Sequence, residues 1–177
     1  MRLNDDHLGT GFLSTGQLLP ALADHGHADA AYRTLLATGV PSWLEMIERG
    51  ATTVWEWWDG IDHDGHARGS LNHYSKGAVL SFLHSHVAGI RLDPVPDAAA
   101  AGYRRVRIAP VPGGDITWAE ATLDTPLGRL VSSWRIADGW FSLDVEVPPG
   151  ASATVELPDG SRHEAGSGTR SFRHPVA

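Results

Sequence analysis

The sequence predicts an α-then-β chain of more than one domain, with helices over residues 1–92 and an antiparallel β-sandwich over residues 93–177. Three observations predict this order. Apolar residues recur at helical spacing before residue 90, and the composition then shifts, because six of the ten histidines and four of the seven tryptophans precede residue 75. After Leu92, apolar and polar residues alternate between closely spaced turn signals, which is typical of a sandwich.

The first predicted element is a helical hairpin over residues 16–36. Leu19 and Leu22 belong to one apolar helix face, and helical spacing resumes over residues 28–37. Gly26 lies between the two helices, where a left-handed C-cap is expected. The pattern therefore predicts two helices joined by a short turn.

A capping pattern marks the start of the next helix. Ser42 is a suitable N-cap, and Glu45 three positions later completes a capping box, so a short helix is expected over residues 43–49. Residues 51–69 contain turn signals and are expected to form a loop. Helical spacing then returns over residues 71–88.

The second part begins with a proline-containing linker, residues 93–96, and a short turn or helix at residues 98–102. Alternating segments bounded by glycine and proline follow, and each predicts a strand. These strands are expected at residues 104–108, 116–125, 130–136, 140–147, 153–157 and 161–165.

Charge and composition exclude several classes of partner. The formal net charge of −7 and the absence of a basic stripe argue against nucleic acid. No run of 18 apolar residues occurs, so no membrane-spanning segment is expected. The chain has no cysteine, which excludes disulfides and thiolate chemistry.

A tryptophan-rich segment, Ala51–Gly60, is the strongest candidate for chemistry. Tryptophan rings stack on the apolar faces of sugars while the indole N–H donates a hydrogen bond. A carboxylate among such rings, Glu56, is partly desolvated and suited to proton transfer. The alternative interpretation is that the tryptophans, Trp43 included, are core anchors and Glu56 is a solvated residue.

The histidines are weaker candidates. His25 and His27 flank a predicted capping glycine, while His63 and His66 lie in a predicted surface turn, so we expect no metal site and no cofactor. His73 differs, because it starts the 71–88 helix directly after the tryptophan loop. Its imidazole is either part of the same cleft or a half-buried structural side chain.

An ordered series of motifs runs along nearly the whole chain. It comprises Gly9–Leu13, Leu18–Pro20, Asp24–Asp29, Ala31–Arg33, Pro41–Trp43, Gly50–Glu56, Asn72–Tyr74, Gly77–Val79, Pro110–Gly114, Thr117–Ala119 and Ser132–Trp134. In this order the motifs resemble the bacterial α-L-rhamnosidases of glycoside hydrolase family 78.

The resemblance implies an enzyme that removes terminal α-L-rhamnose from glycosides with inversion, inside an (α/α)6 barrel followed by a β-sandwich. It implies that Glu56 is the general base, that His73 is an active-site histidine, and that Trp43, Trp55 and Trp58 line the sugar pocket. The implied partner is a rhamnosyl glycoside.

Two departures from the family shape the expectation. The family's general acid lies upstream of the helices present here, and an inverting hydrolase needs both carboxyl groups. The first ninety residues also supply about four or five helices, where a closed barrel of this kind has twelve. The chain is therefore expected to be a C-terminal fragment that holds part of the barrel, residues 1–92, and the sandwich, and to have negligible activity alone.

Two other functions stay open at this point. The chain is alternatively a non-catalytic carbohydrate-binding protein that kept the tryptophan walls, or a structural module in which the sandwich is the working part. Helices taken from a closed barrel expose inner apolar faces, so association through these faces is also expected.

Overall fold

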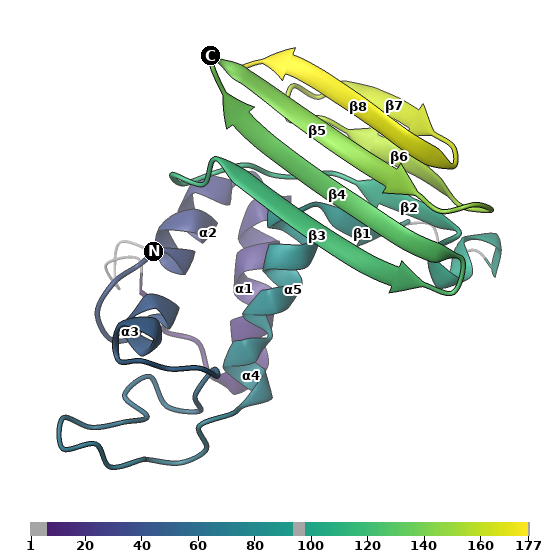
Figure 1. Ribbon diagram of the computed structural model, residues 1–177. Coiled ribbons are helices and arrows are strands. Elements are labelled where there is room, and N and C mark those ends of the chain that lie inside the picture. Colours follow the sequence, from purple (N-terminus) through teal and green to yellow (C-terminus); the bar gives the residue numbers. More distant parts are fainter. Residues whose placement is uncertain (1–6, 94–97, 177) are drawn as a thin grey trace. The chain divides into compact units, whose positions relative to one another are not determined.

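The structure is a computed structural model that describes residues 7–93 and 98–176 (Figure 1). The chain divides into two compact units, Met1–Phe82 and Leu83–Ala177. Helices make up the first unit and strands dominate the second, which confirms the predicted order. The domain boundary expected between residues 92 and 93 stays a prediction, whereas the compact units meet after Phe82.

The first unit opens with the predicted hairpin, α1 (Phe12–Asp24) followed by α2 (Ala28–Leu35). Gly26 between them has φ +79°, the left-handed conformation expected of a capping glycine. Helix α3 (Trp43–Glu48) begins at the predicted N-cap, where the Glu45 amide donates to Ser42 Oγ at 3.0 Å. The capping box is only half formed, because the Glu45 carboxylate accepts from Arg49 Nε at 2.7 Å.

The helix expected over residues 71–88 is broken into three segments. They are α4 (Tyr74–Gly77), α5 (Val79–Phe82) and the π-helical η2 (Leu83–Val87), of which η2 belongs to the second unit. At the first break the carbonyl of Lys76 accepts a hydrogen bond from the Trp43 indole, at 3.0 Å. A side chain that takes up a helix carbonyl interrupts the ladder of backbone bonds, which explains the break.

The core of the first unit lies where α1 and α2 meet α5. Leu19, Tyr32 and Phe82 are fully buried, and the rings of Tyr32 and Phe82 meet edge to face with centroids 5.9 Å apart. Within residues 7–93 and 98–176, no helix has both the length and the apolar character that crossing a membrane demands.

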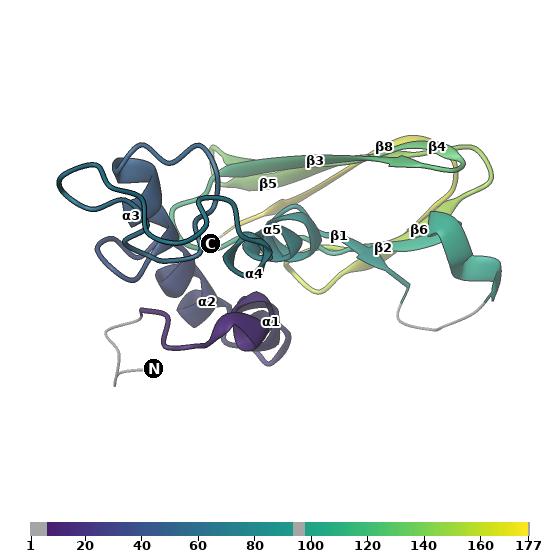
Figure 2. The ribbon, with the colours of Figure 1, turned by 90° about the horizontal axis from the view of Figure 1, so that it is seen from below.

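The second unit is a two-layer sandwich (Figure 2). One sheet has the order β1-β2-β6-β7 and the other β3-β4-β5-β8. The bounds are β1 (Ile90–Leu92), β2 (Arg105–Ile108), β3 (Trp118–Thr125), β4 (Gly128–Ala137), β5 (Trp140–Val147), β6 (Ser152–Glu156), β7 (Arg162–Ala165) and β8 (Gly168–Pro175). A 3-10 segment, η3 (Ala98–Tyr103), precedes β2.

Alternation along the strands builds the core of the sandwich. On β5 every second residue from Phe141 to Val147 is buried, and on β4 the same holds for Leu130, Ser132 and Trp134. Two of these side chains also anchor the start of the unit. Trp134 Nε1 donates to the carbonyl of Val87, and Ser132 Oγ donates to the carbonyl of Ala88, each at 2.7 Å.

All six predicted strands are present, and the sandwich is confirmed. Strands β1 and β8 were not expected, and β2 pairs with β6 in parallel while every other pair is antiparallel. The segment predicted as a short turn or helix is η3. Most of the predicted linker, residues 94–96, lies outside the described residues.

Candidate active site in the tryptophan-rich loop

The candidate site lies in the long loop between α3 and α4, which folds back on itself as two arms. Backbone hydrogen bonds join Glu56 to Ser70 and Gly60 to Arg68, each at 2.8 Å. At the base of the loop the His73 amide donates to the carbonyl of Val54, also at 2.8 Å. Backbone hydrogen bonds between the two arms therefore fix the loop, with Glu56 on one arm and His73 at the end of the other.

Ser70 holds the carboxylate of Glu56. Glu56 Oε2 accepts the backbone N–H of Ser70 at 2.9 Å, which fixes the side chain toward the opposite arm. Within the described ranges no donor contacts the other oxygen, Oε1. One carboxylate oxygen is thus oriented by the protein, and the other keeps its capacity to accept a proton.

Close packing beside Glu56 requires a glycine at position 69. Gly69 has φ +67°, and a Cβ there would lie 2.6 Å from the Trp57 ring and 2.8 Å from Glu56 Oε2. On the same arm the guanidinium of Arg68 lies 4.1 Å from the centre of the Trp57 ring and forms an ion pair with Asp59 at 3.2 Å. Trp57 is exposed, and its ring is held in place by this cation.

Lys76 connects α4 to the back of the loop. Its side chain is only 3% exposed, and Nζ donates a hydrogen bond to the backbone carbonyl of Glu56. Nζ also lies 4.1 Å from the centre of the Trp58 ring, which in turn meets Trp43 edge to face with centroids 5.5 Å apart. A buried cation therefore fixes the main chain at the candidate catalytic residue.

Burial changes the acidity of this amine. Desolvation lowers the pKa of Lys76 from 10.5 to about 8, although the negative charges of Asp59 and Glu56 act in the opposite direction. Lys76 was not among the candidates found in the sequence. It is the only lysine in the chain, and its position within a predicted helix close to the tryptophan-rich segment was the signal that could have found it.

His73 is the N-cap of α4 and has a clear structural role. Its Nδ1 accepts the backbone N–H of Ser75 at 3.3 Å, which leaves Nε2 as the ring nitrogen available to a ligand. The ring also packs against the aromatic rings of Phe12 and Tyr74, with centroids 5.0 Å away in both cases.

The three tryptophans predicted to line the sugar pocket differ in burial. Trp43 and Trp55 are buried, Trp55 with 1% of its surface exposed, which agrees with the alternative interpretation of these two as core anchors. Trp58 is half-buried under Lys76. Their roles as substrate-binding residues, and the roles of Glu56 and His73 in catalysis, stay predictions.

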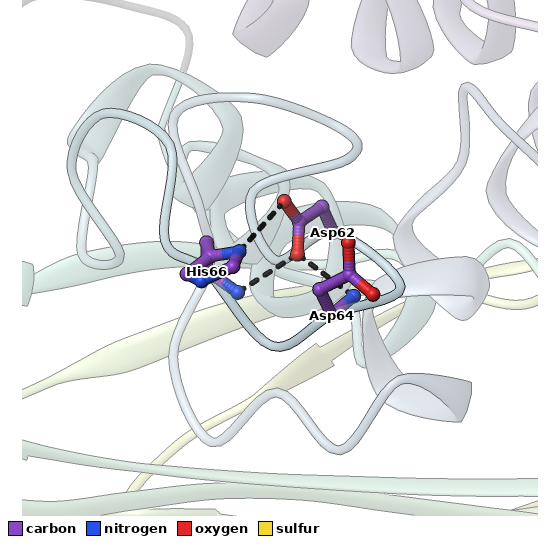
Figure 3. A group of neighbouring side chains, drawn as sticks. All are labelled: Asp62, Asp64 and His66. Atoms are coloured by element: carbon purple, nitrogen blue, oxygen red, sulfur yellow. Dashed lines mark hydrogen bonds and ion pairs between the residues drawn. The ribbon is translucent and has the colours of Figure 1, made fainter.

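The tip of the loop carries a small polar cluster, Asp62, Asp64 and His66 (Figure 3). Their potential metal-ligating atoms lie within 4.8 Å of one another, and all three side chains are exposed. Asp62 Oδ1 accepts the backbone N–H groups of His66 at 2.8 Å and Asp64 at 2.9 Å. These hydrogen bonds lower the pKa of Asp62, and the bond from the His66 amide has the largest effect. The same bonds close a turn, which explains why the three side chains lie together.

Two protein-family models match the two parts of this chain. Residues 1–87 match the bacterial α-L-rhamnosidase six-hairpin glycosidase domain, and residues 89–172 match the bacterial α-L-rhamnosidase C-terminal domain. The chain belongs to the bacterial α-L-rhamnosidase family. The predicted resemblance is therefore confirmed for both parts of the chain.

Individual relatives agree. The chain is 43% identical over 158 residues to an α-L-rhamnosidase of Streptomyces avermitilis and 39% identical to one of Formosa agariphila, in each case over 87% of this chain. It spans only 15% and 16% of the length of those two relatives.

Solved structures give the same result. The native α-L-rhamnosidase from Aspergillus terreus matches 97% of this chain with a TM-score of 0.87 and 38% identity, and the chain covers 20% of it. The S. avermitilis α-L-rhamnosidase complexed with L-rhamnose matches 96% of the chain with a TM-score of 0.85 and 39% identity, and the chain covers 18% of it.

Proposed function

We propose that this chain supplies the general base of an inverting α-L-rhamnosidase, and that the base is Glu56. The observation that carries the proposal is the state of its carboxylate, which Ser70 orients through Oε2 while Oε1 has no donor among the described residues. The substrate class rests on family membership and on the relative that was solved with L-rhamnose.

In the proposed reaction a water molecule lies between Glu56 and the anomeric carbon of a terminal α-L-rhamnosyl unit. Oε1 takes a proton from this water as its oxygen attacks, and the glycosidic bond breaks on the opposite face of the ring. The leaving oxygen receives its proton from a second carboxyl group, which in inverting enzymes lies about 6.5–9.5 Å from the base. We propose that this acid belongs to a segment outside the present chain.

The aromatic residues and His73 have supporting roles in the proposal. The exposed ring of Trp57, held by Arg68, offers a surface on which the apolar face of a sugar can stack. His73 Nε2 can donate to a sugar hydroxyl while Nδ1 is engaged by Ser75. Lys76 keeps the backbone of Glu56 in place.

A chimera tests the assignment. The chain replaces the matching segment of the S. avermitilis relative, to which it is 43% identical, and hydrolysis of an aryl α-L-rhamnoside is followed. NMR of the first product should show the β-anomer of L-rhamnose. Glu56→Gln should lower kcat about 10²- to 10⁴-fold, which is the usual contribution of a general base. Glu48→Gln, at an exposed glutamate of α3, is the matched control and should leave kcat unchanged.

A chemical rescue makes the test specific for a base. Azide attacks without losing a proton, so it should restore turnover to a Glu56→Ala chimera and give the β-L-rhamnosyl azide. Full activity of Glu56→Gln, or formation of the α-anomer first, would refute the assignment. The isolated chain should show negligible turnover, and hydrolysis that Glu56→Gln abolishes in the isolated chain would disprove the proposal about the acid.

A further inference from the structure

The outward face of the sheet β3-β4-β5-β8 carries two exposed tryptophans, Trp118 at 59% and Trp140 at 37% exposure. Side chains alternate across a sheet, so Trp140 projects away from the core into which the next residue, Phe141, is buried. On β4 the buried Trp134 likewise puts Arg135 on the outward face, and Arg135 is the register partner of Trp118. Both tryptophans therefore lie on one face.

Their spacing exceeds the width of a single sugar ring. Trp118 is on β3 and Trp140 on β5, with β4 between them, and the register places them two residues apart along the strands. Strand spacing and rise together separate the two backbone positions by about 12 Å. The side chains between them on this face include Ala137 and Ser142, which are too small to block a ligand that reaches both tryptophans.

The same end of the face is positively charged. Trp118, Arg135, Ser142 and Arg173 form one row across four strands, and the Arg173 guanidinium lies 4.1 Å from the centre of the Trp140 ring. Within residues 7–93 and 98–176, neither Arg135 nor Arg173 has an ion-pair partner. The acidic side chains of this face begin one row further along, at Glu120 and Asp144.

We propose that this tryptophan–arginine surface (Trp118, Arg135, Trp140 and Arg173) binds an oligosaccharide that carries a carboxylate on at least one of its sugar units. The indole rings stack on the sugar rings, and each of the two guanidinium groups, which have no ion-pair partner among the described residues, can bind a carboxylate through two N–H groups. The surface belongs entirely to the second compact unit and does not depend on the proposed role of Glu56.

Affinity electrophoresis of the full chain tests the proposal. The chain should migrate more slowly in a native gel that contains polygalacturonate, and should not be slowed by the same amount of neutral dextran. Its net charge of −7 opposes non-specific attraction to the acidic polymer. Trp118→Ala and Trp140→Ala should each weaken the binding about tenfold, as expected for aromatic anchors.

Matched variants separate this surface from charge alone and from the candidate active site. Arg135→Gln should weaken binding and reduce its dependence on salt, whereas Arg170→Gln, at an exposed arginine of β8 outside the row, should change neither. Glu48→Gln, at an exposed residue of α3 in the other unit, should bind polygalacturonate as the unchanged chain does. Equal urea midpoints for all variants confirm that folding is retained, since the substituted side chains are exposed.

Three results would overturn the proposal. They are the absence of retardation by polygalacturonate, equal retardation by dextran, and retardation that survives loss of both tryptophans. Loss of retardation in Glu48→Gln would instead place the glycan on the first unit and also contradict it. An inactive Glu56 chimera has no bearing on this assay, because no turnover is measured.

Discussion

Replacing Lys76 by methionine should change how the stability of the helical unit depends on pH. The amine is buried, donates to the carbonyl of Glu56 and packs on Trp58. In the folded chain desolvation lowers its pKa to about 8, against 10.5 for an ordinary lysine. Between these two pH values the unfolded state binds more protons than the folded state, so the free energy of unfolding rises as the pH rises.

The size of the effect follows from the two pKa values. Each pKa unit corresponds to about 1.4 kcal/mol, so the full gain is about 3 kcal/mol, and about 2 kcal/mol of it is reached by pH 10. At neutral pH, methionine removes the cost of burying a charge but leaves the Glu56 carbonyl without its donor, which costs about 1–3 kcal/mol. The two terms nearly offset each other, so the two proteins should differ little at neutral pH.

Urea unfolding followed by helical circular dichroism measures the difference at about pH 7.5 and about pH 10. The unchanged chain should gain about 2 kcal/mol over Lys76→Met between these conditions. Burial raises the pKa of Tyr32, which opposes stability at high pH, but Tyr32 is present in both proteins and cancels in the comparison. Lys76→Arg keeps its charge throughout, so it should lack the gain as well.

A direct measurement is also open, because Lys76 is the only lysine. In a chain labelled with ¹³C-lysine, a single side-chain signal should titrate near pH 8. A titration near 10.5, or a stability difference that does not change with pH, would refute the account of Lys76 as a desolvated amine that holds the Glu56 backbone.

Three further outcomes are expected. Apolar side chains are exposed on the first unit, Leu13 at 90% among them. Size-exclusion chromatography should therefore show self-association, and a hydrophobic dye should bind. A monomer that binds no dye would contradict this expectation. Trp134→Ala should destabilise the sandwich by about 3–5 kcal/mol in urea unfolding, since it removes a buried ring and its hydrogen bond. A loss below about 1 kcal/mol would be inconsistent with that packing. Gly89→Ala should lower the urea midpoint, because Gly89 has φ +91° and a Cβ would lie 2.4 Å from the Pro110 nitrogen. An unchanged midpoint would show that the backbone at position 89 has room for a side chain beside Pro110.

Most of the fold was predictable because local chemistry decides it. The glycine at position 26, the cap at Ser42 and the alternation on β5 each act within a few residues, and each is found as predicted. The break after α4 was not predictable, since it depends on the Trp43 indole reaching a carbonyl 33 residues away. Strand β8 was missed because its residues are largely exposed and carry little alternation.

The sequence indicated candidate residues for the site but not their arrangement, and the roles of these residues stay predictions. The motif series indicated Glu56 and His73, and the structure brings both to the base of one loop. Burial of Trp55 was decided by tertiary packing against Gly60, which no spacing rule contains. The contributions of Ser70 and Lys76 were missed because each acts on Glu56 through a backbone group, and backbone partners leave no pattern in the sequence.

The parallel pairing of β2 with β6 has a consequence for the order in which the second unit folds. Strands β3, β4 and β5 pair with their neighbours in sequence, so this meander closes only short loops, whereas β2 must wait for a strand that follows all three of them. Loop closure over longer separations is slower because more chain entropy is lost before a contact forms. The meander should therefore form first, and the pairing of the β6–β7 hairpin with β2 should be the late event that completes the sandwich.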